Sequence, residues 1–257
     1  MTDRRQRQKE QRAARLEEER KAATRKEFRR RIVVALAIGL GLTGLLVLIT
    51  VLGNQPTTLP ASYQAFRDQP TACGAEAPPE VEIMSFPEPE DQGVGTEPVT
   101  ATINTSCGPI VLELDPANYP ATVNSFMFLA REGFYDGSVF HRIATDFVIQ
   151  GGDPEATGTG APGYVVPDEF PPDDFIYEEG VVAMANAGGG TTGSQFFVVV
   201  GDDARVLNNT FNVLGRVGSG QETLDAIEAV STAAAPGSNE RSRPLEAVYI
   251  ESIEIGE

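Results

Sequence analysis

The chain has 257 residues, which allows one or two domains, and its formal net charge at pH 7 is −17. This charge averages two unlike parts: residues 1–31 hold thirteen Lys or Arg and six Asp or Glu, whereas residues 53–257 hold seven Arg, no Lys and thirty-one acidic residues. So acidic a part repels nucleic acid and anionic lipid, which argues against a nucleic-acid-binding function. One His and two Cys are also too few for an ordinary zinc site.

Residues 1–31 form a basic segment rich in Arg, Glu, Gln and Ala, a composition that favours helix. Its apolar residues are too few to bury a face, so no independent folded domain is expected there. We predict a solvated cytoplasmic segment beside a membrane helix. An arm that contacts nucleic acid or a cytoplasmic partner is the alternative.

Residues 32–52 are twenty-one residues without a charge. As an α-helix they would span about 31 Å, close to the ~30 Å hydrocarbon core of a bilayer, so we predict a transmembrane helix. A cleaved signal peptide is the competing interpretation, but its apolar region is about 7–15 residues long and ends in small residues, unlike Val51-Leu52-Gly53. Basic residues 29–31 precede the run and the next is Arg67, so the positive-inside rule places the N-terminus in the cytoplasm and the rest outside.

Residues 53–97 are rich in Pro and in acidic residues and show no sustained apolar period. Such segments repel themselves and stay extended, so we predict an extracytoplasmic linker. A helical turn fits residues 63–68. Cys73 indicates that the linker is attached to the rest of the chain at one point.

Residues 98–257 have the pattern of a folded domain. Val99–Thr105 alternates like a strand, Gly108-Pro109 marks a turn, and Ile110–Leu114 is the expected hairpin partner. Apolar residues at helical spacing predict helices over 119–131 and 222–230. Short strands separated by turn residues are typical of a sandwich or barrel. We expect these further strands at 138–143, 147–150, 164–166, 181–184, 195–200, 211–217 and 247–255.

Three blocks of this part carry distinctive motifs. The first is Phe140–Pro154, FHRIATDFVIQGGDP; the second is Val182–Phe197, VAMANAGGGTTGSQFF; the third is Leu207–Val217, LNNTFNVLGRV. In order and spacing they resemble the cyclophilin-type peptidyl-prolyl cis-trans isomerases, over roughly residues 98–257. With the apolar run before them, they suggest a bacterial membrane-anchored form.

The resemblance implies a mostly β fold: an eight-stranded antiparallel barrel capped by two helices, here preceded by the transmembrane helix. It also implies prolyl isomerase activity on proline-containing polypeptides. Rotation about an X–Pro bond must cross a barrier of about 18–20 kcal/mol, which amide resonance sets. A cation that hydrogen-bonds the prolyl nitrogen only in the twisted form lowers this barrier, so no cofactor, metal or nucleophile is expected.

Arg142 would supply this donor, because an arginine stays charged at any working pH. By residue type alone it could instead be a strand-edge arginine whose stem covers apolar surface. The resemblance implies that Gln195 supports Arg142 and that His141 is a packing residue. It assigns the catalytic role to Arg142, Phe147 and Gln150. It assigns substrate binding to Val148, Ala185, Asn186, Ala187, Gln195, Phe197, Leu207 and Phe211.

Three positions depart from the best-known eukaryotic members: Val148 stands where Met is common, Val206 where Trp occurs, and Phe211 where His is usual. They bring cyclosporin affinity into question more than isomerisation. The glycine-rich run 188–193 lacks the Lys and the strand–loop–helix context of a phosphate loop, so we interpret it as a turn.

Cys73 and Cys107 are the only cysteines, and both follow the predicted membrane span. The compartment outside the membrane permits disulfides, so we predict a Cys73–Cys107 bond. Two independent thiols are the alternative.

Two functions from different classes fit these observations. The first is a single-pass membrane protein whose extracytoplasmic domain isomerises X–Pro bonds in exported or membrane proteins. The second is a non-catalytic scaffold that binds proline-rich peptides at the membrane. Arg142, Gln150 and Gln195 favour the first, because binding alone needs no transition-state donor.

Overall fold

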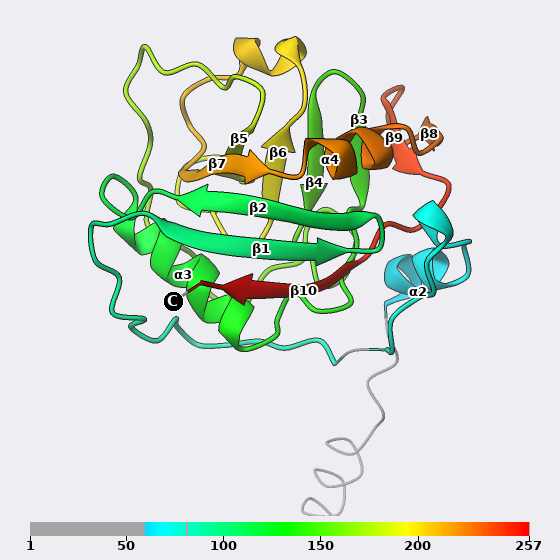
Figure 1. The fold of residues 1–257 in the computed structure, drawn as a ribbon, viewed down its shortest axis with the longest axis horizontal. Helices are drawn as coiled ribbons and strands as arrows, with labels where there is room; N and C mark the ends of the chain where they lie inside the picture. Colours follow the sequence, from blue (N-terminus) through cyan, green and yellow to red (C-terminus); the bar gives the residue numbers. More distant parts are fainter. Residues whose placement is uncertain (1–59, 81, 257) are drawn as a thin grey trace, which may run out of the picture. The chain divides into compact units, whose positions relative to one another are not determined.

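The computed structural model describes residues 60–80 and 82–256 (Figure 1). The predicted basic segment 1–31 and the predicted transmembrane helix 32–52 lie outside these residues, as do residues 53–59 of the predicted linker. Within the described ranges, no helix is both long and apolar enough to cross a membrane. The membrane topology therefore stays a prediction.

An eight-stranded antiparallel sheet is the central element of the described structure. Its strands lie side by side in the order β10-β1-β2-β7-β5-β6-β4-β3, and a separate two-stranded hairpin pairs β8 with β9. The strands of the sheet are β1 (Val99–Thr105), β2 (Gly108–Leu114), β3 (Arg142–Ala144), β4 (Val148–Gly151), β5 (Val181–Met184), β6 (Phe196–Val199), β7 (Val213–Ser219) and β10 (Ile250–Ile255).

The sheet curls until its two edges meet, without a full ladder between them. No pairing joins β3 to β10 in the described chain, but the segment before β3 is hydrogen-bonded to the segment that leads into β10. The Phe140 amide donates to the Val248 carbonyl at 2.9 Å, and the Ile250 amide donates to the Ser138 carbonyl at 2.8 Å. The predicted barrel is thus correct in its eight antiparallel strands, but it is a curled half-barrel whose edges are joined by isolated bonds.

Two helices pack on the sheet as predicted. Helix α3 (Pro120–Arg131) contacts β10 and β7, and α4 (Gln221–Glu228) contacts β2 and β3 (Figure 1). Proline suits the first position of α3, because no hydrogen bond is lost there. The Glu169 carboxylate accepts the amides of Ala121 and Thr122 at 3.0 and 2.8 Å, which satisfies free donors at this helix end.

Strand alternation separates the main core from a second apolar cluster. Successive side chains of a strand point to opposite faces. In β6, Phe196 enters the main core, whereas the next residue, Phe197, enters the second cluster. In β4, Ile149 lies in the main core and Val148 in the second cluster. The second cluster belongs to the candidate site described below.

Some predicted elements are wrong. Residues 164–166 form no strand, because only the Val166 amide makes a backbone bond there, to the Thr192 carbonyl at 2.8 Å. The strand expected at 138–143 begins only at Arg142. The hairpin of β8 (Thr232–Ala234) and β9 (Arg241–Pro244) was not expected, because neither stretch alternates apolar with polar residues.

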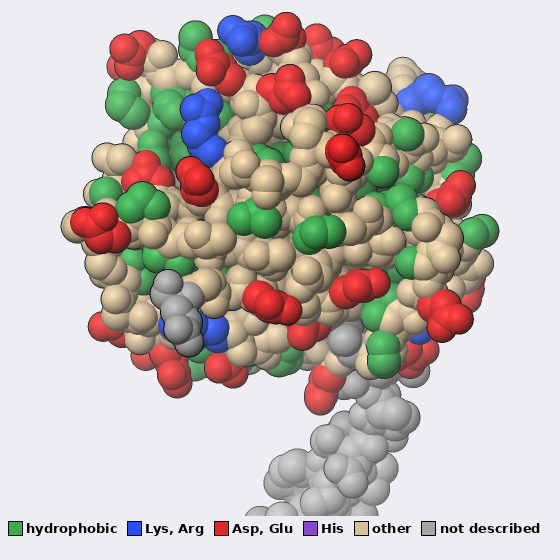
Figure 2. Space-filling view, in the orientation of Figure 1, with side chains coloured by type: hydrophobic (Ala, Val, Ile, Leu, Met, Phe, Trp, Pro, Cys, Tyr) green, Lys and Arg blue, Asp and Glu red, His purple; other side chains and the backbone are tan. Residues whose placement is uncertain are grey.

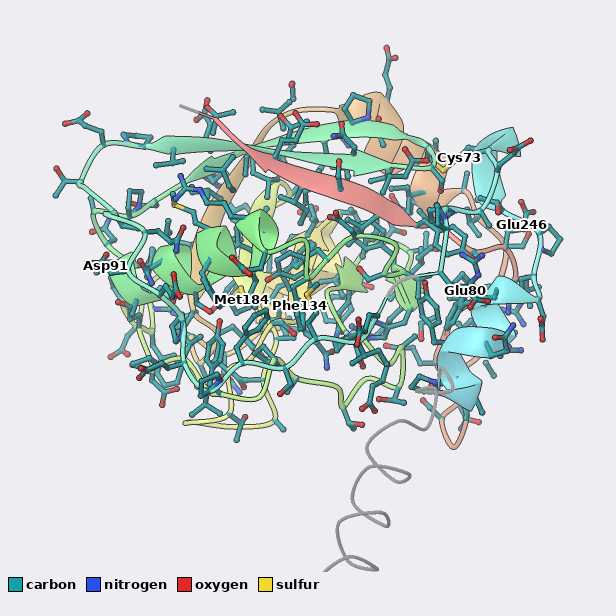
Figure 3. The ribbon with its side chains drawn as sticks, turned by 90° about the horizontal axis from the view of Figure 1, so that it is seen from below. Cys73, Glu80, Asp91, Phe134, Met184 and Glu246 are labelled. Atoms are coloured by element: carbon teal, nitrogen blue, oxygen red, sulfur yellow. A yellow bond between two sulfur atoms is a disulfide. The ribbon has the colours of Figure 1, made fainter. Side chains whose placement is uncertain are left out.

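The described part of the predicted linker packs on the domain instead of standing free. Helix α2 (Ala61–Arg67) buries Tyr63 and Phe66, and the Tyr63 hydroxyl donates to the Gly137 carbonyl at 2.6 Å. Further along, Phe86 packs edge-on against Phe128 of α3, with ring centroids 5.0 Å apart. Figure 3 shows the path of this segment from Glu80, near α2, to Asp91, beside α3. The expectation of a single attachment point is therefore wrong.

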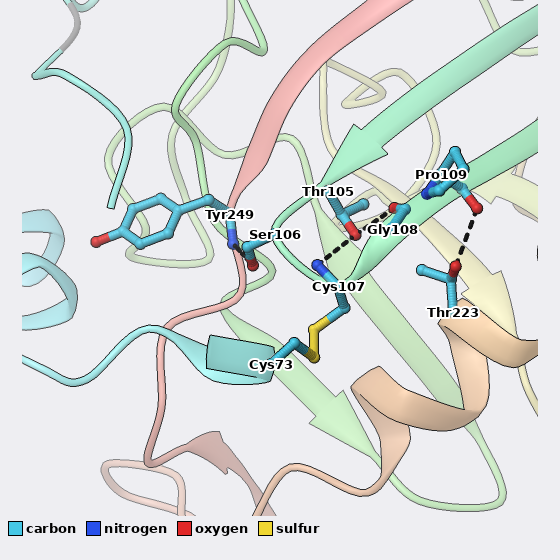
Figure 4. The surroundings of a disulfide bond; sticks show 8 residues. All are labelled: Cys73, Thr105, Ser106, Cys107, Gly108, Pro109, Thr223 and Tyr249. Carbon is cyan, nitrogen blue, oxygen red and sulfur yellow. Dashed lines mark hydrogen bonds between the residues drawn. A yellow bond between two sulfur atoms is a disulfide. The ribbon is translucent and has the colours of Figure 1, made fainter. Parts of the chain in front are cut away.

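The predicted Cys73–Cys107 disulfide is confirmed, and it joins this segment to the β1–β2 turn (Figure 4). The two Cα atoms are 5.2 Å apart. The turn is held on both sides: the Cys107 amide donates to Thr105 Oγ1 at 3.1 Å, and Thr223 Oγ1 of α4 donates to the Pro109 carbonyl at 3.0 Å. The bond therefore fixes the described residues between 60 and 98, which we call the α2 segment, to a rigid point of the sheet.

Candidate active site

Strand register brings two of the predicted catalytic residues, Arg142 and Gln150, next to the predicted substrate-binding residue Phe197. Arg142 on β3 is paired with Gln150 on β4, and Gln150 is paired with Phe197 on β6. Residues paired across antiparallel strands share one side of the sheet. The three side chains therefore start from neighbouring positions on one surface.

A chain of amides leads from Arg142 into the protein. Arg142 Nη1 donates a long hydrogen bond of 3.4 Å to Gln150 Oε1, and Gln150 Nε2 donates to Gln195 Oε1 at 3.0 Å. Gln195 is 9% exposed and donates in turn to the Gly160 carbonyl at 3.0 Å and to the buried Asp153 carboxylate at 3.4 Å. Gln195 is thus linked to Arg142 through Gln150.

Glu240 holds the other edge of the Arg142 guanidinium. Arg142 Nε donates to Oε2 at 2.9 Å and Nη2 donates to Oε1 at 2.6 Å, a bidentate arrangement. Hydrogen bonding from Arg142 lowers the pKa of Glu240 to about 2, against the opposing effect of partial burial and with help from Ser242. The side chains are 26% and 41% exposed, so solvent weakens the pair but leaves its geometry defined.

Sequence reasoning missed Glu240. It lies just before β9, in a polar stretch with no motif, and nothing distinguishes it from the many other acidic residues of the chain. Only the position of the β8–β9 hairpin beside β3 brings its carboxylate to the arginine.

An apolar cluster adjoins the arginine. Its predicted members are the buried Val148 and Phe197 and the partly exposed Phe147, Leu207 and Phe211. The Arg142 Cζ atom lies 5.2 Å from the Phe147 ring centroid, which is cation–π distance. The cluster therefore offers apolar rings directly beside a fixed cation.

Tyr177 supports this cluster from behind and was also missed. Its ring is fully buried and contacts Phe197 and Phe211, with centroids 6.3 and 6.2 Å apart. Its hydroxyl donates to the Phe211 carbonyl at 2.9 Å. Burial raises the pKa of Tyr177 to about 12, so the hydroxyl keeps its proton and this bond.

Further predicted substrate-binding residues line a pocket of about 280 Å³, and Gln150 forms part of its wall as well. Asn186 on its wall donates to the Thr210 carbonyl at 2.7 Å and accepts the Gly188 amide at 3.1 Å. The glycine-rich run beside it is a turn, as interpreted from the sequence. We call this the amide pocket; it is lined by Gln150, Ala185, Asn186, Ala187 and Gln195 together with residues 158–161, Thr191, Gly193 and Ser194.

The remaining positions lie at the margins of the site. Burial lowers the pKa of His141, and the nearby Arg142 lowers it further against the effect of Asp153, so the imidazole is neutral. Neither ring nitrogen has a hydrogen-bond partner within the described residues, which agrees with a packing role. Val206 is 84% exposed, at the rim beside Leu207.

Comparisons with known proteins show which family the chain belongs to. The family model "Cyclophilin type peptidyl-prolyl cis-trans isomerase/CLD" matches residues 100–255. The chain is 41% identical to the probable peptidyl-prolyl cis-trans isomerase A of Mycobacterium leprae, over 61% of this chain and 91% of that protein. It is 40% identical to peptidyl-prolyl cis-trans isomerase B of Streptomyces anulatus, over 62% of this chain and 97% of that protein.

Solved structures give the same answer. A crystal structure of a cyclophilin-type peptidyl-prolyl cis-trans isomerase from Cryptosporidium parvum matches with a TM-score of 0.56 and 29% identity, over 62% of this chain and 98% of that one. The same isomerase crystallised in the presence of the dipeptide Ala-Pro matches with a TM-score of 0.54. The chain therefore belongs to the cyclophilin-type peptidyl-prolyl cis-trans isomerases.

Proposed function

We propose that the domain accelerates rotation about X–Pro bonds by donating a hydrogen bond from Arg142 to the prolyl nitrogen. The observation that carries this proposal is a guanidinium held on one edge by Glu240 and set against the ring of Phe147. A fixed cation beside apolar rings suits a proline, which offers a ring and an amide nitrogen within a few ångströms of each other.

The donor acts only when the bond is twisted. In the planar amide the nitrogen lone pair is delocalised and accepts no hydrogen bond; at the twisted geometry it is localised. Glu240 occupies Nε and one Nη2 proton, and Nη1 makes only a long contact to Gln150, so guanidinium protons stay available to the substrate. Binding that exists only in the transition state lowers the barrier.

The neighbouring groups hold the rest of the substrate. The proline ring rests on the apolar cluster, and the backbone next to it enters the amide pocket, where Gln150 and Asn186 offer polar groups. Gln150 is oriented by Gln195, which is itself fixed by the Gly160 carbonyl. The proline ring and the backbone before or after it are thus held separately, so one can rotate relative to the other about the X–Pro bond.

The test is the pair Arg142→Ala and Arg142→Lys. A preorganised donor of this kind is worth about 10²–10³ in rate, so Arg142→Ala should lower kcat/KM by roughly that factor. Arg142→Lys should recover little, because an ammonium lacks the planar fork that Glu240 holds. Peptide affinity should change far less, since the apolar cluster is intact.

Two outcomes contradict the proposal. Turnover at the wild-type level in a folded Arg142→Ala removes the catalytic role of the arginine. An inactive wild-type protein that still binds proline-containing peptides moves the domain to the scaffold function.

The proposal includes a location. The uncharged run 32–52 and the basic segment before it support a single-pass anchor with the isomerase domain outside the cytoplasm. The Cys73–Cys107 disulfide supports an oxidising compartment. Exported and membrane polypeptides are then the substrates within reach.

A further inference from the structure

A second, larger groove opens on the other side of Arg142. Its volume is about 660 Å³, within the range of ligand-binding clefts. Arg142, Glu240 and Gln150 line it, and Gln150 and Gly158 line the amide pocket as well. The groove is therefore continuous with the candidate active site.

One wall of this groove comes from outside the family domain. This wall consists of Ser62, Ala65 and Phe66 of helix α2 and of Gln69 just after it, whereas the family match begins only at residue 100. The opposite wall is the β8–β9 hairpin, with Ala235, Pro236 and Arg243. We call this space the α2 groove.

The α2 wall is firmly attached. Ser62 Oγ donates to the Glu155 carbonyl at 2.5 Å, and the Ala72 amide donates to the Ala247 carbonyl at 2.9 Å. Phe66 is 6% exposed and packs with Tyr249 in a small apolar cluster. Together with the disulfide, these contacts make α2 a fixed part of the binding surface.

We propose that the α2 groove binds the substrate polypeptide on the side of the proline opposite to the amide pocket. This inference deepens the proposed function and rests on it. A chain whose proline lies on the apolar cluster extends in two directions: one leads into the amide pocket and the other passes Arg142 into the groove. An extended segment covers about 3.3–3.6 Å per residue, so two or three residues fill a groove of this kind.

The lining defines the kind of segment that fits. Phe66, Ala65, Ala156 and Pro236 offer apolar contacts, and Arg243 offers a cation to backbone carbonyls. The groove therefore favours extended segments with apolar side chains.

The experiment compares three peptides on the full chain: Ac-Ala-Pro-NH₂, which is too short to extend along the groove, and the same peptide lengthened by Leu-Ser-Leu at either end. Exchange between cis and trans is followed by NMR, which needs no chromophore. One of the two extensions should lower KM by about three- to tenfold, as expected for a few buried apolar side chains.

Ala65→Trp fills the groove from an exposed position of α2 and should abolish this gain. Turnover of the short peptide should stay within about twofold of wild type, because this peptide does not extend along α2. The matched control is Ala77→Trp, at an exposed alanine of the same segment that does not line the groove. It should keep the gain. Melting curves show whether both variants are folded.

The results separate the two proposals. If neither extension changes KM, or if both tryptophan variants behave alike, the α2 groove does not bind substrate, although the short peptide is still turned over. If the wild-type protein fails to turn over the short peptide, the proposed function itself is wrong.

Discussion

At the scale of single residues, the site depends on how Arg142 is held. Gln150 touches one edge of its guanidinium at 3.4 Å, and Glu240 binds the other edge at 2.9 and 2.6 Å. The stronger contact therefore comes from the residue outside the three motif blocks. The Glu240 carboxylate partly neutralises the charge of the guanidinium. It also fixes the plane of the guanidinium, and with it the direction in which the remaining N–H groups donate.

Replacing Glu240 by Gln should lower kcat/KM by about two- to fivefold, with the loss mainly in kcat, because a partly exposed ion pair is worth about 0.2–1 kcal/mol. Glu240→Asp should recover part of the activity if the charge, rather than the length, matters most. Glu246→Gln, at an exposed acid of the next loop, is the control. A kcat equal to that of wild type in Glu240→Gln would show that Arg142 needs no second anchor.

The same pair has a signature in stability against pH. The pKa of Glu240 is lowered to about 2 in the folded protein, below its value of 4.5 in the free state. A lowered pKa stabilises the fold above the unfolded pKa, and this contribution disappears as the pH falls through the folded pKa. The melting-temperature difference between wild type and Glu240→Gln should therefore be constant above about pH 5 and shrink toward pH 2. A difference that grows on acidification would contradict this assignment.

At the scale of elements, sequence patterns identified those with strong periodicity. The helices near 119–131 and 222–230 and the strand at 99–105 follow from apolar spacing, and the strand at 181–184 from the turn residues that bound a short apolar run. The β8–β9 hairpin and the packing of α2 did not follow. Their residues contact distant parts of the chain, such as Glu240 with Arg142 and Tyr63 with Gly137, and no local pattern encodes such contacts.

The candidate site likewise combines residues that the sequence predicted with residues that it did not. The resemblance supplied Arg142, Phe147 and Gln150, because these residues lie within contiguous motifs. It could not supply Glu240 or the α2 wall, since they come from a loop without a motif and from a segment before the family domain.

We expect the Cys73–Cys107 disulfide to contribute to the free energy of unfolding. Its loop spans a sequence separation of 34 residues, and in the chain-entropy account it stabilises by about 3–4 kcal/mol. The double variant Cys73→Ser and Cys107→Ser should lose up to that amount in denaturant unfolding. Proteolysis of the native protein should accelerate first within residues 60–98. Cleavage that begins inside the sheet instead would show that the bond stabilises the barrel rather than the α2 segment.

At the scale of the whole molecule, charge is the dominant feature. Figure 2 shows Asp and Glu spread over the visible face of the domain, with few Lys or Arg among them. The basic residues are concentrated instead at positions 1–31. In the proposed topology, repulsion from anionic lipid would keep the acidic domain away from the bilayer and open to passing polypeptides.

This asymmetry predicts the orientation of the chain in a cell. The basic segment before residues 32–52 favours a cytoplasmic N-terminus, and the first basic residue after the run is Arg67. In spheroplasts that express the full chain with an N-terminal tag, added protease should release or digest the acidic domain, while the tag stays with the cells. A cytoplasmic marker protein must survive, which shows that the membrane is sealed.

The state of the two cysteines gives a second test of this orientation. Trapping thiols at the moment of lysis should find Cys73 and Cys107 already bonded, because an oxidising compartment forms the bond before the cells are opened. Complete protection of the domain in sealed spheroplasts, with both cysteines reduced, would place the isomerase on the cytoplasmic side and change its substrates to cytoplasmic ones.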